Sequence, residues 1–105
     1  MLYLTKRVGD WFEVGDRLAF RIAATQPRRV SLAVSGETPG GETLRWITVG
    51  AMPSFFYAAH RGGRFAVAVH VEKMSGGVIR IGVDCDPCVP IRHDAAPRNS
   101  AATER

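Results

Sequence analysis

Adjacent pairs of cations are the most chemically suggestive residues in this chain. Lys6 with Arg7, and Arg28 with Arg29, each place two positive charges side by side. Such pairs hold the phosphates of a nucleic acid, although a basic pair on a strand edge also serves simply to block aggregation. The sequence contains no nucleophile elbow, no phosphate-binding glycine loop ahead of a helix and no pair of carboxylates beyond chance. We therefore expect binding and no enzymatic catalysis.

Two cysteines are the other chemically suggestive residues, and their spacing is that of a CxxC motif. Cys85 and Cys88 lie in a turn between two expected strands, whereas a redox motif has a helix that starts at the motif. Zinc is usually held by four ligands, and no second CxxC or close pair of histidines is present. A zinc site would require the cysteine pairs of two chains in a dimer, with His93 as a further ligand. We otherwise expect no metal and no cofactor.

The composition favours a small soluble domain with an anionic partner. The chain has 105 residues, 46% of them hydrophobic, with a formal charge of +4 and a pI of about 9.7. A basic chain suits a nucleic acid, although charge says nothing about the fold. No apolar run approaches the roughly 18–20 residues that span a bilayer, and no secretory leader is recognisable. With two cysteines in the chain, we expect a cytoplasmic protein without a membrane partner.

Alternation of apolar and polar residues predicts an all-β fold built mainly from antiparallel strands. In residues 17–22, for example, large apolar residues alternate with arginine or alanine. Turn residues such as Gly15-Asp16 and the loop 35–43 separate the strands. We expect strands at residues 2–8, 11–14, 17–22, 29–34, 44–49, 64–71, 79–83 and from residue 89 onward.

Residues 50–63 differ in texture, because they contain a run of adjacent apolar residues. Pro53 suits the first turn of a helix and Gly62-Gly63 suits its end, so a short helix near 53–61 is predicted, with a hydrophobic loop as the alternative. Residues 95–105 are small and polar without any period, and they are expected to form a disordered tail.

A weak internal repeat relates two expected hairpins. RLAFRIAATQPRRVSLAV starts at Arg17 and resembles RFAVAVHVEKMSGGVIRIGV, which starts at Arg64. Both segments consist of an arginine, an alternating strand, a turn and a second strand, and the second segment has two extra residues in its turn. The similarity suggests a duplication, although any two β-hairpins look alike.

Two segments far apart in the chain together resemble the carbon storage regulator (CsrA/RsmA) family of RNA-binding translational regulators. MLYLTKRVGDWFEVGD at the start is similar to the opening of that family, and VIRIGVDCDPCVPIRHD, residues 78–94, is similar to a later part of it. Both segments occur in the family's order and cover roughly half of the chain. The chain departs from the family in its middle, where about residues 36–63 are additional, and in lacking an amphipathic helix at its end.

The resemblance implies a CsrA-like β-barrel or sandwich over residues 1–94, with about 36–63 as an inserted segment. Two architectures fit this departure from the family. In one, the domain carries a large insertion and still forms a homodimer, as the family does. In the other, the internal repeat marks a partial fusion, and one chain forms an intrachain pseudo-dimer.

The same resemblance implies a function and a site. Family members bind GGA-containing hairpin loops in mRNA leaders and alter translation or mRNA stability, so messenger or small regulatory RNA is the expected partner, and a protein antagonist is a further one. The site is expected where the first strand of one subunit runs beside the last strand of the other. The residues carried over to this site are Leu4, Thr5, Lys6, Arg7, Val89, Ile91, Arg92 and His93, with Arg28 and Arg29 as secondary basic contacts.

One position departs from the family in a way that matters for affinity. The family's key arginine falls on His93, and Arg92 lies one residue earlier, where its side chain should point to the opposite face of a strand. Either a register shift or bulge brings Arg92 to the RNA, or His93 takes over with a weaker charge. This departure and the aromatic residues Phe55, Phe56 and Tyr57 support an alternative function, a protein-interaction module that has lost RNA binding and docks on a protein partner.

Overall fold

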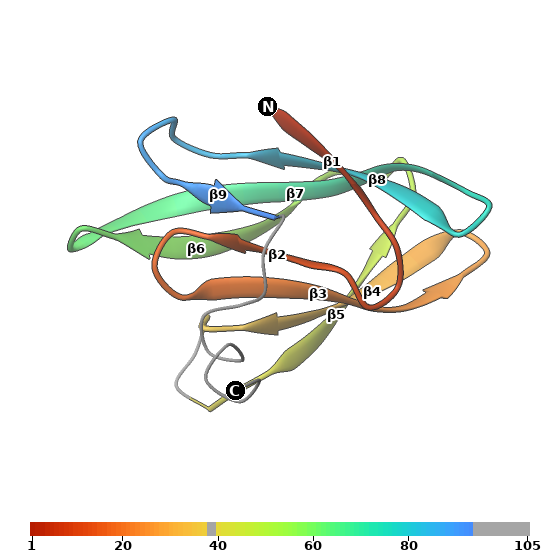
Figure 1. The fold of residues 1–105 in the computed structure, drawn as a ribbon, viewed down its shortest axis with the longest axis horizontal. Coiled ribbons are helices and arrows are strands. Elements are labelled where there is room, and N and C mark those ends of the chain that lie inside the picture. Colours follow the sequence, from red (N-terminus) through yellow and green to blue (C-terminus); the bar gives the residue numbers. More distant parts are fainter. Residues whose placement is uncertain (38–39, 94–105) are drawn as a thin grey trace.

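The structure, a computed structural model, describes residues 1–37 and 40–93. Within these residues the chain forms nine strands and no helix, which confirms the all-β prediction and leaves no helix there that could cross a membrane. The strands, coloured from red to blue along the chain in Figure 1, are β1 (Leu2–Lys6), β2 (Trp11–Val14), β3 (Leu18–Gln26), β4 (Arg29–Ser35), β5 (Thr43–Thr48), β6 (Ser54–His60), β7 (Gly63–Ser75), β8 (Val78–Asp84) and β9 (Ile91–Arg92). The tail expected at 95–105 lies outside the described residues.

Two antiparallel sheets form the two layers of the fold (Figure 1). One sheet has four strands in the order β1-β8-β7-β6, and the other has five in the order β5-β4-β3-β2-β9. Every pairing between neighbouring strands is antiparallel. Because β1 pairs with β8 and β9 pairs with β2, the first and last strands are each built into the sheet formed mainly by the opposite half of the chain.

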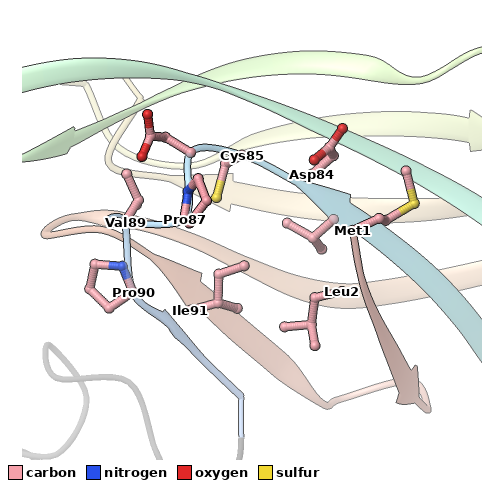
Figure 2. Close-up of a pocket in the computed structure, with 10 residues that line it drawn as sticks. Met1, Leu2, Asp84, Cys85, Pro87, Val89, Pro90 and Ile91 are labelled. Carbon is pink, nitrogen blue, oxygen red and sulfur yellow. The ribbon is translucent and has the colours of Figure 1, made fainter.

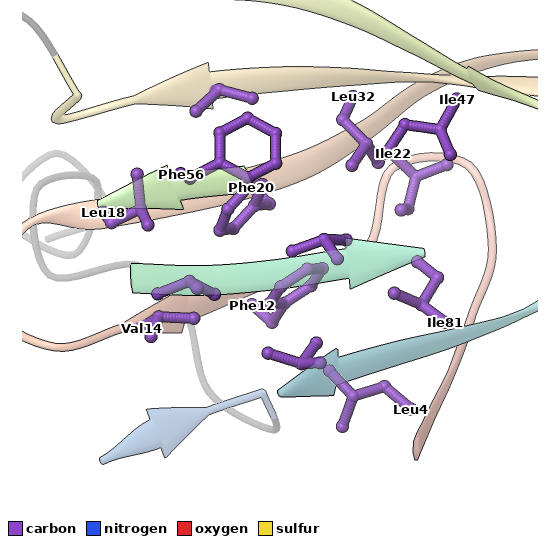
Figure 3. Packing of buried hydrophobic residues seen from close by; sticks show 14 of the residues in the cluster. Leu4, Phe12, Val14, Leu18, Phe20, Ile22, Leu32, Ile47, Phe56 and Ile81 are labelled. Carbon is purple, nitrogen blue, oxygen red and sulfur yellow. The ribbon is translucent and has the colours of Figure 1, made fainter. Parts of the chain in front are cut away.

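One hydrophobic core fills the space between the sheets (Figure 3). At its centre Phe12 stacks on Phe20 with 4.7 Å between ring centroids, and Phe56 meets Phe20 edge-on at 4.9 Å. All three rings are fully buried. Burial of a side chain of this size stabilises a fold by about 1.5–3 kcal/mol, so these residues of β2, β3 and β6 tie the two sheets together.

The short helix predicted near 53–61 is wrong, because the structure has strand β6 there. Phe56 and Ala58 point into the core, whereas Phe55 and Tyr57 are exposed on the other face of the sheet. This is the period of two that a strand requires, and pairing with β7 satisfies those main-chain groups of β6 that point toward β7. The apolar residues on the outer face concealed the period in the sequence.

Strands β1–β4 and β5–β8 are two copies of one arrangement. Exchanging β1 with β5, β2 with β6, β3 with β7 and β4 with β8 converts the order β1-β8-β7-β6 of one sheet into the order β5-β4-β3-β2 of the other. Each copy therefore contributes its first strand to the sheet of the other copy. Residues 36–63, expected as an inserted segment, supply β5 and β6, which are the first two strands of the second copy.

The pairing register of the two copies repeats as well. The β3–β4 hairpin corresponds to the β7–β8 hairpin at a constant offset of 49 positions, so that Ile22 opposite Leu32 matches Val71 opposite Ile81. The register shifts just after Ile22 in β3 and just after Val71 in β7. The two turns therefore have equal length. The prediction of two extra residues in the second turn is wrong, because it aligned the two hairpins incorrectly.

Two glycines extend the similarity to the start of each copy. The N–H of Gly9 donates to the carbonyl of Ile22 at 2.8 Å, and the N–H of Gly50 donates to the carbonyl of Val71 at 2.9 Å. Both glycines have positive φ, at 95° and 78°, where a side chain would be strained. The chain thus leaves the first strand of each copy through the same kind of turn.

The correspondence between the copies ends at β9. This strand pairs with β2, where Ile91 lies opposite Val14 and Arg92 lies opposite Glu13. No strand of the described residues takes the corresponding place beside β6. The five-stranded sheet therefore has one more strand, β9, beyond β2, whereas the four-stranded sheet ends at the corresponding strand β6.

Candidate nucleic-acid interface

The segments at the two ends of the described chain lie next to each other on one side of the fold. The last segment is held on β2 by strand pairing and by a hydrogen bond from the N–H of Gly15 to the carbonyl of Pro90 at 2.9 Å. The Lys6 ammonium on β1 donates to the carbonyl of His93, directly after β9. The structure thus brings together the two segments on which the predicted site depends, although these two residues are 87 positions apart.

Lys6 is a buried cation. Burial alternates along β1, so Leu4 and Lys6 face inward whereas Thr5 is exposed. A buried ammonium is costly unless it is paired, and the carbonyl of His93 supplies a partner. Lys6 therefore fastens β1 to the end of β9 and does not extend outward to a phosphate.

Arg7 is the exposed cation of the N-terminal pair. It follows β1 in a turn that is fixed by a hydrogen bond from its own N–H to Oδ2 of Asp10 at 2.9 Å. Its guanidinium reaches toward Gly77 in the β7–β8 turn. Together with the exposed hydroxyl of Thr5, it gives the edge of β1 a positively charged, polar surface that a phosphate can approach.

Arg92 forms an ion pair with Glu13, which lies opposite it on β2. A guanidinium nitrogen donates to Oε1 of Glu13 at 2.6 Å, and the Glu13 side chain is 9% exposed. A charge-assisted hydrogen bond of this kind is roughly twice as strong as a neutral one. The pairing of β9 with β2 shows no register shift that would turn Arg92 outward. Arg92 therefore holds β9 on β2, whereas His93 is exposed beside the end of β1.

A groove of about 420 Å³ lies between the start of β1, the end of β8 and the last segment (Figure 2). Val89 is buried there and Ile91 is half-buried, so these two predicted RNA contacts build the wall of the groove. Asp84 and Asp86 also line it, and two carboxylates repel a phosphate. The basic part of the interface therefore lies at the other end of β1. The full lining is Met1, Leu2, Val83, Asp84, Cys85, Asp86, Pro87, Val89, Pro90 and Ile91.

The outer face of the four-stranded sheet carries aromatic and basic side chains beside β1 that sequence reasoning missed. Arg80 lies over the Tyr3 ring at 4.4 Å from its centroid, and His70 meets Tyr3 edge-on at 6.1 Å. The His70 ring lies across Gly82, where a Cβ would come within 2.3 Å of it. The pairing of β1 with β8 and of β8 with β7 creates this cluster, so no local sequence signal reveals it.

The second basic pair is not joined to this interface. Arg28 and Arg29 lie at the β3–β4 turn, in the other sheet. Arg29 donates from Nε to Oε1 of Gln26 at 2.7 Å and lies over the ring of Trp46 at 4.5 Å. These contacts keep Arg29 on the surface of β3, β4 and β5, and nothing described links the pair to β1 or β9.

The corresponding place in the second copy lacks both cations. By the pairing of β1 with β8 and of β5 with β4, Ile47 and Thr48 stand where Lys6 and Arg7 stand in the first copy. The counterpart of β9 is also absent from the part of the chain that the structure describes. That part therefore forms one such interface and no second.

The two cysteines are free thiols next to the groove. Burial, followed by the charges of Asp84 and Asp86, raises the pKa of Cys85, which is half-buried. A hydrogen bond with Asp86 raises the pKa of Cys88, which is exposed. Both thiols stay protonated at neutral pH, which disfavours nucleophilic or redox chemistry. Within residues 1–37 and 40–93, no three metal-ligating side chains gather in one place.

Comparisons with protein family models, with characterised proteins and with solved structures found no match to this chain. The observations that bear on function are the strand arrangement and the contact between β1 and the segment that ends at His93.

Proposed function

We propose that this protein binds RNA through the edge formed by β1 and β9, and that it acts as a post-transcriptional regulator resembling the carbon storage regulators. The observation that carries the proposal is the contact between Lys6 and His93. It joins the two segments of the resemblance into one surface, in the relationship that the family's site requires.

Three features of this surface suit single-stranded RNA. Strands β1 and β9 each end a sheet, so their outer main-chain groups can read the edges of unpaired bases. Arg7 supplies a cation for the phosphates, and Thr5 supplies a hydroxyl. On β1, Tyr3 offers a ring for a base to stack on, beside the guanidinium of Arg80, which also pairs with Glu72.

The regulatory effect would come from occupancy. A protein bound to a GGA-containing loop in an mRNA leader covers the ribosome-binding site or alters the access of nucleases, and so modulates translation or mRNA stability. No bond is made or broken in this mechanism. The raised pKa of both thiols agrees with a binding role for the segment that carries them.

The proposal includes an intrachain pseudo-dimer. Two copies that exchange their first strands are what a fusion of two domains of the family type would form, and the exchange of β1 and β5 supports this origin. One chain then offers one RNA site, because Ile47 and Thr48 replace the two cations in the second copy.

A gel-shift titration with a hairpin that carries GGA in its loop tests the proposal, and a CCA loop is the control. We expect salt-sensitive binding at micromolar protein, with one RNA per chain. Arg7→Ala should weaken binding by about tenfold. Arg28→Ala, which removes an exposed arginine in the other sheet, should not. Equal binding of the two hairpins, or no binding at micromolar protein, would refute the RNA proposal.

A protein-interaction module is the second candidate function, and two observations favour it. Lys6 and Arg92 are both bound within the protein, so the interface presents fewer outward cations than its sequence suggests. Phe55 and Tyr57 form an exposed aromatic pair on β6. If both hairpins fail to bind a folded protein, this candidate becomes the leading one.

A further inference from the structure

The outer edge of β6 is the place where the similarity between the two copies breaks down. In the first copy, β9 pairs with Glu13 and Val14 of β2. By the pairing of β2 with β3 and of β6 with β7, the corresponding residues of β6 are Phe55 and Phe56. Within the described part of the chain, β6 ends its sheet and no strand pairs with this edge.

The directions of the main-chain groups along this edge follow from one hydrogen bond. The N–H of Asp16 donates to the carbonyl of Ala59 at 2.8 Å, so Ala59 directs its main-chain groups away from β7. Because these directions alternate along an antiparallel strand, Tyr57 and Phe55 direct their N–H and C=O groups the same way. The edge therefore offers the donors and acceptors of two residues to an extended segment.

A groove of about 510 Å³ opens beside the same edge. Its walls include Tyr57 and Ala59 of β6, Arg64 of β7, Arg45 of β5, and Glu37 after β4. The groove of Figure 2 occupies the corresponding place at the end of β8, and there the last segment forms one wall. At the end of β4, residues 57–59 of β6 form that wall instead.

The side chains of the edge and groove specify the kind of segment that fits. Arg45 pairs with Glu37 at 3.2 Å, whereas Arg64 lies over the Tyr57 ring at 4.1 Å, so the groove carries a net positive charge. An acidic side chain on the outer face of the sheet complements the charge of Arg64. Strand β6 contains no Asp, Glu, Lys or Arg to protect it from pairing, and Phe55 and Tyr57 are 61% and 49% exposed.

We infer that β6 accepts an extended segment of a partner protein in which apolar residues alternate with acidic ones. The segment adds a strand beside β6, as β9 does beside β2. Its apolar side chains face the groove beside Arg45, and its acidic side chains lie on the outer face near Arg64. This binding is separate from the proposed RNA binding, because β6 and β1 are opposite edges of one sheet.

Hydrogen exchange of the protein alone tests whether the edge is open. We expect the amides of Phe55 and Tyr57 to exchange at least about tenfold faster than those of Phe56 and Ala58, which are bonded to β7. Similar protection at all four residues would show that the edge is already covered and would end the proposal.

Two peptides test the nature of the occupant by heteronuclear NMR. The probes are Glu-Val-Glu-Ile-Glu-Val-Glu and Lys-Val-Lys-Ile-Lys-Val-Lys, which differ in charge and share their apolar pattern. We expect the acidic peptide to slow exchange at Phe55 and Tyr57 and to bind at least about tenfold more tightly than the basic one. Arg64→Glu should remove that preference, and Arg28→Glu should not. No binding of the acidic peptide up to about 1 mM contradicts the inference.

Tyr57→Pro tests the main-chain contacts. Proline removes an N–H that points away from β7, so the variant loses an edge donor and keeps the β6–β7 pairing. We expect it to lose the acidic peptide while its gel shift with the GGA hairpin is unchanged, so failure here and failure of the RNA proposal are distinguishable. If the variant does not fold, a peptide methylated on its main-chain nitrogens replaces it as the test. A concentration-dependent dimer that buries β6 would identify a second copy as the occupant and refute the inference.

Discussion

The ammonium of Lys6 donates a hydrogen bond to the main-chain carbonyl of His93, and this bond joins the outer edges of the two sheets. Strand β1 belongs to the four-stranded sheet and β9 to the five-stranded one, so their side-by-side position depends on contacts such as this bond. The proposed RNA interface needs both edges in a fixed relationship. The same lysine that the sequence offers as a phosphate contact therefore serves to build the interface.

Replacing Lys6 by Met should weaken the contact between β1 and the residue that follows β9. Methionine keeps an apolar stem inside the protein but removes the ammonium that bonds to the carbonyl of His93. We expect the free energy of unfolding to fall by about 1–3 kcal/mol and hydrogen exchange in β9 to become faster. Urea unfolding measures the loss, and Lys73→Met, at an exposed position of β7, is the matched control. If the two variants are equally stable, Lys6 has no structural role.

The ion pair between Arg92 and Glu13 should contribute measurably to stability. In a double-mutant cycle with Arg92→Ala and Glu13→Ala, we expect a coupling energy of about 1–2 kcal/mol, because the carboxylate is largely buried and the bond is short. The exposed pair of Arg21 and Glu42, at 3.4 Å, should give no more than about 0.5 kcal/mol. Equal coupling in the two cycles would mean that Arg92 does not hold β9 in place.

The sequence predicted the strands whose two faces differ in polarity and failed where they do not. Strand β3 was predictable because Phe20 and Ile22 are buried, whereas Arg21 between them is exposed. Strand β6 was not, because Phe55 and Tyr57 make its outer face as apolar as its inner face. The sequence left two architectures open, an inserted domain and an intrachain pseudo-dimer, since the exchange of β1 and β5 depends on pairing between distant segments that no local pattern encodes.

At the interface, the resemblance predicted which segments meet, and the structure decides which charges face outward. Lys6 and Arg7 are neighbours in sequence, but one is buried beneath β1 and the other is exposed beyond its end. The choice between Arg92 and His93 depended on the register of β9 with β2, which places Glu13 opposite Arg92. A partner on another strand cannot be deduced from the residues around position 92.

Replacing His93 by Arg should strengthen RNA binding. The imidazole is exposed next to the end of β1, and arginine would place a permanent, planar charge there. We expect the Kd for the GGA hairpin to fall about three- to tenfold and the salt dependence to become steeper by about one phosphate contact. His93→Gln is the neutral control and should not tighten binding. An unchanged Kd for the arginine variant would indicate that the RNA does not pass over this residue.

Cys85 and Cys88 should react slowly at neutral pH. Burial and neighbouring carboxylates raise the pKa of Cys85 above the ordinary value of 9.0, and the hydrogen bond with Asp86 raises that of Cys88. The folded protein therefore holds the thiol protons more tightly than the unfolded chain does, and the free energy of unfolding falls as the pH rises from about 9.0 toward the raised pKa values. Alkylation by iodoacetamide at about pH 7.5 should be slower in the folded protein than in urea. Because Cys88 is exposed, slow alkylation at this residue reflects its raised pKa and not steric shielding. Asp86→Asn should restore the rate at Cys88, whereas equal rates in the folded and unfolded states would show that Asp86 does not retain the proton.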